Sequence, residues 1–161
     1  MRTISREIAV AMIVSKDGKI FFGMKHPDKG GVYIDCWHLP GGGVEKNESK
    51  KQALVREVME ETGIDILPYE VVLIDDVGEG ESEKTLEENG ERVLCKMKFY
   101  VYKIEINDKE ASEIKIVLSD ELEKYVWFNI SEARSKKLTP PSVELFERLG
   151  YFKVVALQGN L

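Results

Sequence analysis

The sequence predicts an α/β domain. Segments with the apolar patterns of strands recur along the chain, and two further segments have helical composition with capping residues at their ends. A length of 161 residues suits one domain, residues 1–161, that is large enough to bury a substantial core. Hydrophobic residues make up 43% of the chain and charged residues 32%, which is ordinary for a globular protein.

The predicted strands begin near the amino end. Residues 7–15 are rich in Ile and Val, and the tight turn Asp17-Gly18 leads into a second strand over residues 19–25. Residues 93–101 alternate apolar and polar side chains, as in a strand with one buried face. Shorter strands or extended segments are predicted at residues 71–77, 114–118 and 125–130. The acidic, Gly-containing residues 78–92 are assigned no strand.

Two helices are predicted. Residues 49–62 contain no Gly or Pro and are rich in good helix formers. Asn47 or Ser49 can cap the start of this helix, and Gly63 suits the left-handed position just past its end. The second helix covers residues 139–150, with a proline at its first position and a glycine at its end.

The first predicted helix carries a cluster of acidic side chains. Glu57, Glu60 and Glu61 fall within one arc of about 100°. The opposite side, which a sheet could cover, holds Leu54, Val55, Val58 and Met59. Neighbouring carboxylates repel one another, and binding a hard divalent cation would remove that repulsion. The alternative is a solvated acidic face, which is what most glutamate clusters are.

The acidic cluster belongs to a longer motif, residues 42–64, GGVEKNESKKQALVREVMEETGI. The pattern matches the whole Nudix box, G-x5-E-x7-R-E-U-x-E-E-x-G-U, in which U is apolar. Its fixed positions are Gly42, Glu48, Arg56, Glu57, Val58, Glu60, Glu61, Gly63 and Ile64. The chain therefore resembles the Nudix (MutT-like) hydrolases. The resemblance implies an α/β fold with a mixed β-sheet sandwiched between α-helices (α/β/α).

Other residues of the motif are expected to support the acidic cluster. Gly41 and Gly42, in a run of three glycines after a proline, would let the backbone turn tightly and approach a phosphate or a metal. Arg56 is expected to pair with Glu48 or with a loop carbonyl and so to hold the loop against the helix. Glu45 is either a further metal contact or a surface charge.

The resemblance also implies a reaction. Nudix hydrolases cleave a nucleoside diphosphate linked to another group X, with Mg²⁺ or Mn²⁺ held by box carboxylates. On this sequence the implied metal ligands and catalytic residues are Glu57, Glu60 and Glu61. Metal ions neutralise charge on phosphoryl oxygens and lower the pKa of a bound water.

Two residues outside the box complete the expected site. In some relatives the general base is a box glutamate. In others it is a carboxylate about six residues before an aromatic strand residue, and counting back from Trp127 gives Glu121, with Asp120 and Glu123 beside it. Lys25, at the end of the second predicted strand, resembles a basic residue that touches phosphate in related enzymes.

The sequence does not identify the substrate. Residues 77–80 carry neither the proline typical of the ADP-ribose-cleaving group nor the tyrosine typical of the dinucleoside-polyphosphate group. The preferred hypothesis is cleavage of a nucleoside triphosphate, oxidised ones included, to monophosphate and pyrophosphate. One alternative is an ADP-ribose or nucleotide-sugar pyrophosphatase. An alternative of another class is a Nudix-fold sensor that binds a nucleotide without cleaving it.

Composition indicates which partners to expect. A net charge of −6 and a pI near 5.1 argue against a nucleic-acid or anionic-membrane surface, although bound metal ions would still allow polyphosphate binding. Cys36 and Cys95 fit no metal-ligand pattern and are expected to be free, buried thiols. The apolar run Ile8 to Val14 is too short to span a membrane. We therefore expect a cytoplasmic monomer or homodimer with a nucleotide-derived substrate.

Overall fold

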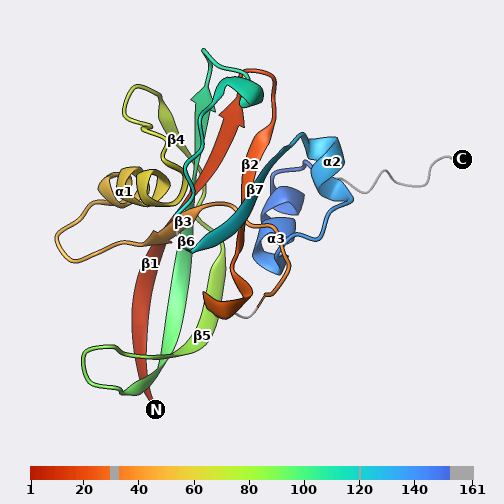
Figure 1. The fold of residues 1–161 in the computed structure, drawn as a ribbon. Helices are drawn as coiled ribbons and strands as arrows, with labels where there is room; N and C mark the ends of the chain where they lie inside the picture. The colour runs from red at the N-terminus through yellow and green to blue at the C-terminus, as the bar shows by residue number, and fades with distance from the viewer. Residues whose placement is uncertain (30–32, 120, 153–161) are drawn as a thin grey trace, which may run out of the picture.

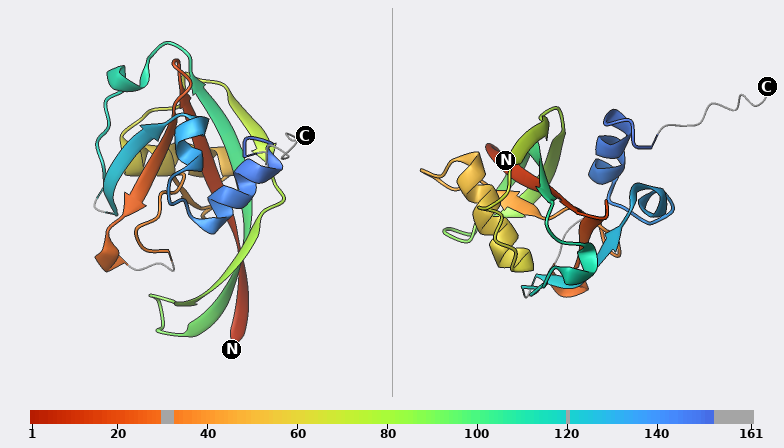
Figure 2. Two further views of the ribbon diagram at one scale, coloured as in Figure 1. Left: turned by 90° about the vertical axis from the view of Figure 1, so that its right-hand side faces the viewer. Right: turned by 90° about the horizontal axis from the view of Figure 1, so that it is seen from above.

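One mixed sheet with helices on both faces forms the body of the protein. The computed structural model describes residues 1–29, 33–119 and 121–152. Helix α1 (Lys50–Thr62) covers one face of the sheet, and the short α2 (Ile130–Arg134) and α3 (Pro140–Arg148) cover the other (Figure 1). The three layers are separated most clearly in the view from above (Figure 2). The α/β/α architecture expected from the sequence is therefore confirmed.

Seven strands make up the sheet within the described residues. They are β1 (Arg2–Ser15), β2 (Ile20–Lys25), β3 (Gly41–Gly43), β4 (Val71–Asp75), β5 (Glu79–Thr85), β6 (Arg92–Ile106) and β7 (Leu122–Phe128). Their order is β4-β6-β1-β2-β7, with β3 beside β1 and β5 beside β6. The central pair β1–β6 is parallel, and the other strand pairs are antiparallel. Two 3₁₀ turns, η1 (Pro27–Lys29) and η2 (Ala111–Glu113), complete the elements.

The amino-terminal half of β1 extends beyond the helices together with β5 and β6, and we call this part the three-stranded extension (Figures 1 and 2). The sequence did not predict β5. Its residues, EGESEKT, alternate glutamates with Gly, Ser and Lys and offer no apolar face. β5 is paired along its whole length with β6, from Glu79 opposite Lys98 to Thr85 opposite Arg92. Backbone pairing with a more apolar neighbour therefore defines this strand.

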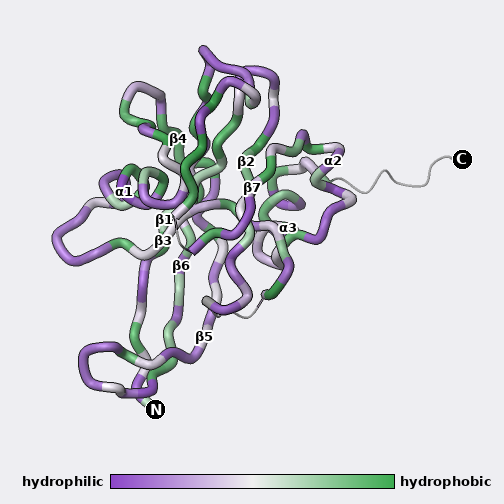
Figure 3. The backbone as a smooth tube through the Cα atoms, viewed as in Figure 1, coloured by the Kyte–Doolittle hydropathy of each residue, from purple (hydrophilic) through white to green (hydrophobic). Residues whose placement is uncertain are grey.

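Each face of the sheet has its own apolar core. On the α1 side, Leu54 and Val58 are fully buried against Ala9, Ala11 and Ile13 of β1. On the other side, Met12, Phe22, Val101, Leu145 and Phe146 form the second core. Figure 3 shows the apolar segments crossing the body and the hydrophilic segments in the outer loops. Met59, which the sequence placed on the covered side of the helix, is 45% exposed and is not part of this core.

The helix boundaries follow the sequence more closely than the strand boundaries do. Ser49 caps α1 in a reciprocal capping box with Gln52, and Gly63 ends the helix at φ 76°, as predicted. β1 begins at Arg2 and β6 continues to Ile106, so both are longer than their apolar patterns indicate. Residues 114–118, for which a short strand or extended segment was predicted, form no strand, and α2 was not predicted.

The structure also bears on two expectations from composition, one about the cysteines and one about membrane-spanning segments. Both cysteines, Cys36 and Cys95, are free and buried. Among the described residues, no helix has the length and apolar character needed to cross a membrane.

Candidate active site

The glycine run packs against the second half of α1, and together they form the corner, which holds Gly41–Gly43, Arg56, Glu57 and Glu61. β3 pairs with β1, with Gly41 opposite Val10, Gly42 opposite Ala9 and Gly43 opposite Ile8. A Cβ at Gly41 would overlap the Ala9 carbonyl, and a Cβ at Gly42 would overlap the Glu57 carboxylate. The absence of side chains therefore lets the loop lie directly on β1 and lets Glu57 lie directly on the loop.

Arg56 ties the loop to the helix. Its Nε and Nη2 donate to both oxygens of Glu48 at 2.8 and 2.9 Å, and Nη2 also donates to the Gly43 carbonyl at 3.1 Å. Its Nη1 donates to Glu57 Oε1 at 2.8 Å. These bonds to Arg56 lower the pKa of Glu48 to about 2. Arg56 thus makes both contacts that the sequence offered as alternatives, one to Glu48 and one to a loop carbonyl.

Glu61 is the buried acid of the site. Glu61 is only 4% exposed, and its Oε2 accepts a hydrogen bond from the Gly41 N–H at 2.8 Å. Burial, with smaller contributions from the charges of Glu57 and Glu121, raises the pKa of Glu61 to about 8, and the Gly41 N–H and Lys25 oppose the rise. Burial also raises the pKa of Glu57, in spite of its bond to Arg56.

The fold brings most of the expected site residues together. Glu121, in the turn before β7, is close enough to raise the pKa of both Glu57 and Glu61 on α1, and Lys25, at the end of β2, is close enough to lower that of Glu61. The His26 N–H donates to the Glu121 carbonyl at 3.1 Å, which holds the end of β2 beside the start of β7. Asp120 lies outside the described residues.

Two other acids of the motif lie further out. The Glu60 side chain is 57% exposed and reaches Arg56 Nη1 at 3.6 Å. The Glu45 side chain is 65% exposed and lies 3.7 Å from the same nitrogen. Both therefore surround Arg56 on the outer side of the corner, whereas Glu57 and Glu61 face the loop.

The donor set of this corner suits a hard divalent cation. Within residues 1–29, 33–119 and 121–152, no three acidic, imidazole or thiol groups converge closely enough to form a ready metal site. The carboxylates of Glu57 and Glu61 are nevertheless all-oxygen donors, which Mg²⁺ and Mn²⁺ prefer. Burial is the main cause of both raised pKa values, with a smaller contribution from neighbouring carboxylates, and a divalent ion would favour the ionised form of both groups.

Sequence reasoning missed one side chain at this corner. Arg6, on β1, lies against Gly43, where an added Cβ would overlap its Nη2. No local pattern reveals this contact, because it depends on β3 pairing with β1 some thirty-five residues away. The third glycine of the run, which the Nudix box does not require, is the signal that something approaches closely there.

Known proteins match parts of this sequence. An RNA pyrophosphohydrolase of Hydrogenovibrio crunogenus is 43% identical over 54 residues, which are 34% of this chain and 29% of that protein. A CTP pyrophosphohydrolase of Escherichia coli is 43% identical over 65 residues, which are 39% of this chain and 45% of that protein. The alignments thus span less than half of either relative.

A solved structure matches over a longer stretch. The crystal structure of a MutT protein from Methanosarcina mazei Go1 has a TM-score of 0.68 and 24% identity, and the match covers 93% of this chain and 96% of that one. This likeness shows the fold.

The fold and the corner define the class of protein. It is an α/β protein in which a glycine-rich loop packs against a helix that carries several glutamates. The family model of the NUDIX domain matches residues 5–149. The chain belongs to the Nudix family.

Proposed function

We propose that this protein is a divalent-metal-dependent hydrolase of the diphosphate linkage in a nucleoside diphosphate joined to a group X, preferentially a nucleoside triphosphate. The observation that carries the proposal is the pair of carboxylates against the glycine loop, the half-buried Glu57 on Gly42 and the buried Glu61 on the Gly41 N–H. The complete Nudix box supports it, and so does the name of the CTP pyrophosphohydrolase among the relatives.

Each residue of the corner has a proposed task. Glu57 and Glu61, with Glu60 beside them, would hold Mg²⁺ or Mn²⁺. The bound cation would supply positive charge to the phosphoryl oxygens and make water more acidic. Lys25 would donate to a phosphate oxygen, and Glu121 would accept the proton of the attacking water as general base.

The remaining motif residues position these groups. Gly41 and Gly42 let the backbone approach the phosphates, and Gly63 ends α1 where the chain must turn away. Arg56 and Glu48 keep the loop and the helix in register, so that Glu57 and Glu61 face the same space. Glu121 lies on a different element from the proposed metal ligands. It can therefore approach the attacking water from another side.

Hydrolysis is preferred over nucleotide sensing because every fixed acid of the box is present. The test is a panel of compounds incubated with Mg²⁺ or Mn²⁺, with the products separated and measured. The panel contains nucleoside triphosphates, an oxidised purine triphosphate, ADP-ribose, a nucleotide sugar and a short RNA with a 5′-triphosphate. Tight binding without product from any compound would support the sensor instead.

The glutamates of the corner provide the sharper test. Glu61→Gln should lower kcat at least a hundredfold while the fold is kept, because the amide has the same size and can still accept from the Gly41 N–H. Glu83→Gln, on β5 and away from the corner, is the matched control and should match wild type. Equal rates for wild type and Glu61→Gln at saturating Mg²⁺ would overturn the metal-ligand role.

A further inference from the structure

Arg6 lies on the face of the sheet opposite α1. Gly43 pairs with Ile8, so its missing side chain would point to the same face as Ile8 and Arg6. Farther along β1, Val10 and Met12 on this face pack into the core under α2 and α3. The Arg6 guanidinium rests on the backbone of Gly43, whereas the Glu57 carboxylate rests on Gly42 from the other side.

The guanidinium of Arg6 has no partner among the described residues. It has no hydrogen bond or ion pair there. By contrast, a carboxylate pairs with each of Arg2, Arg56, Arg92 and Arg148. A guanidinium carries five donors in a fixed planar fork, which match the oxygens of a phosphate or a carboxylate. Arg6 is therefore poised to bind an anion that the chain itself does not supply.

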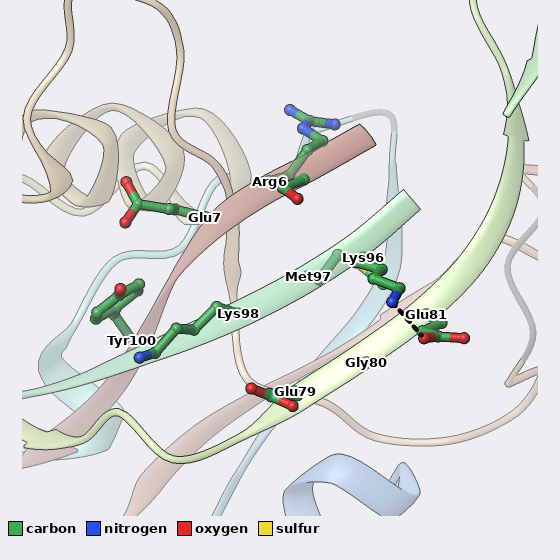
Figure 4. Close-up of a pocket in the computed structure, with 10 residues that line it drawn as sticks. Arg6, Glu7, Glu79, Gly80, Glu81, Lys96, Met97, Lys98 and Tyr100 are labelled. Atoms are coloured by element: carbon green, nitrogen blue, oxygen red, sulfur yellow. Dashed lines mark ion pairs between the residues drawn. The ribbon is translucent and has the colours of Figure 1, made fainter. Parts of the chain in front are cut away.

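A hollow of about 560 Å³ lies along the three-stranded extension, and Arg6 is one of its lining residues (Figure 4). Two other cations of this hollow are already engaged. Lys96 pairs with Glu81 at 3.9 Å, and the Lys98 ammonium lies 5.5 Å from the centre of the Tyr100 ring. Figure 4 shows Arg6 and Glu7 leaving β1 in different directions, with Glu7 on the side of Tyr100.

We propose that Arg6 binds a phosphate of the substrate beyond the two phosphates that lie next to Glu57 and Glu61. Gly43 is two residues along β3 from Gly41, whose N–H contacts Glu61, and two residues of strand span about 7 Å. Among the described residues β3 pairs with β1 alone, so a triphosphate that passes around the outer edge of β3 spans from Glu61 on that edge to Arg6 on the other face. The inference rests on the proposed function. It assigns this chain a preference for substrates in which the group X, linked to the nucleoside diphosphate, carries a phosphate.

Steady-state kinetics on two substrates test the assignment. Arg6→Gln should raise KM for a nucleoside triphosphate about 10- to 100-fold, the loss expected for charge-assisted hydrogen bonds, with a smaller change in kcat. KM for a nucleoside diphosphate linked to a neutral sugar should stay within about twofold, since it lacks the third phosphate. Arg2→Gln, on the same strand about 13 Å away, removes an equal charge and should match wild type.

Gly43 supplies an independent variant. In Gly43→Ala the new methyl group should displace the guanidinium, because the end of a flexible side chain moves more easily than backbone does. KM for the triphosphate should rise as in Arg6→Gln. The double variant should be no worse than Arg6→Gln alone, and additive losses would contradict a shared cause.

A measurement without turnover separates this inference from the proposed function. The Nε–H signal of Arg6, assigned by its loss in Arg6→Lys, should shift when a non-hydrolysable nucleoside triphosphate analogue saturates the protein with Mg²⁺. An unchanged Nε–H signal would overturn the proposal. An equal rise in KM for both substrates would overturn it too, as would a rise in KM that depends on which base the triphosphate carries. Absence of hydrolysis by wild type, with the signal shifted, overturns the proposed function alone.

Discussion

At the scale of single residues, Arg56 decides the geometry of the corner. One guanidinium bonds to Glu48, to Glu57 and to the Gly43 carbonyl, so it joins the loop, the start of α1 and a candidate ligand. Its charge also keeps Glu48 ionised, since the pKa of Glu48 is lowered to about 2. Substituting it therefore removes a positioning group and leaves two carboxylates without their cation.

Arg56→Ala is expected to lower the melting temperature by about 2–10 °C, because several charge-assisted hydrogen bonds lose their donor. Activity should fall as well, since Glu57 is no longer held. Calorimetry measures the first effect. Arg92→Ala, at a 58% exposed side chain with one ion pair of 3.7 Å, is the control and should change the melting temperature little. An unchanged melting temperature in Arg56→Ala would assign the guanidinium to the substrate.

Glu121 tests the assignment of the base. Glu121→Gln should lower kcat by about 10²–10⁴ with little change in metal affinity, because a base acts in the chemical step. Alkaline pH should partly restore the rate, since hydroxide then needs no base. Glu123→Gln, two residues along and exposed, is the matched control. If only the Glu123 variant is impaired, the count of six residues from Trp127 has selected the wrong acid.

At the scale of elements, an ion pair fastens α3 to the edge of the sheet. Arg148, at the end of α3, donates from Nε and Nη2 to the two oxygens of Asp75 on β4, at 3.0 and 2.8 Å. The Asp75 side chain is only 7% exposed. Bonding to Arg148 lowers the pKa of this aspartate. The carboxyl-terminal helix is thereby held on the second core by charge as well as by Leu145 and Phe146.

Arg148→Ala should cost about 1–3 kcal/mol of stability at neutral pH, because it leaves a nearly buried carboxylate without its partner. Since the folded pKa of Asp75 is below its unfolded value, the stabilisation is complete above about pH 4 and is lost as the pH falls through the folded pKa. Urea unfolding of both proteins from pH 7 to pH 2 measures this. A difference that stays constant down to pH 2 would mean that Arg148 acts through packing.

Elements with local signals could be predicted from the sequence, and the others could not. The helix α1 has good helix formers, a Ser49 cap and Gly63 at its end, so its bounds were predicted to within one residue. β5 and the ends of β1 and β6 lack such signals, because pairing with a neighbour defines them. The same applies to the site: the box predicts its own acids, but the position of Arg6 follows from strand pairing.

At the scale of the whole molecule, one sheet serves two cores and one site. β1 contributes Ala9, Ala11 and Ile13 to the α1 side, Met12 to the α3 side, and Arg6 to the glycine loop. The strand therefore fixes the helix of carboxylates, the opposite helical layer and the loop relative to one another. Changes in β1 are expected to affect stability and the site together.

The parallel pairing of β1 with β6 also has a consequence for the order in which the protein assembles. Residues 2–15 pair with residues 93–106, so a chain growing from its amino end must wait for β6 before β1 is flanked on both sides. Contacts between distant segments slow folding, because a long loop must close first. α1 is complete much earlier, with Leu54 and Val58 still lacking Ile104 and Ile106. Glu57 and Glu61 share this early helix, so Glu121, in the turn before β7, is the acid that joins the corner last as the chain grows.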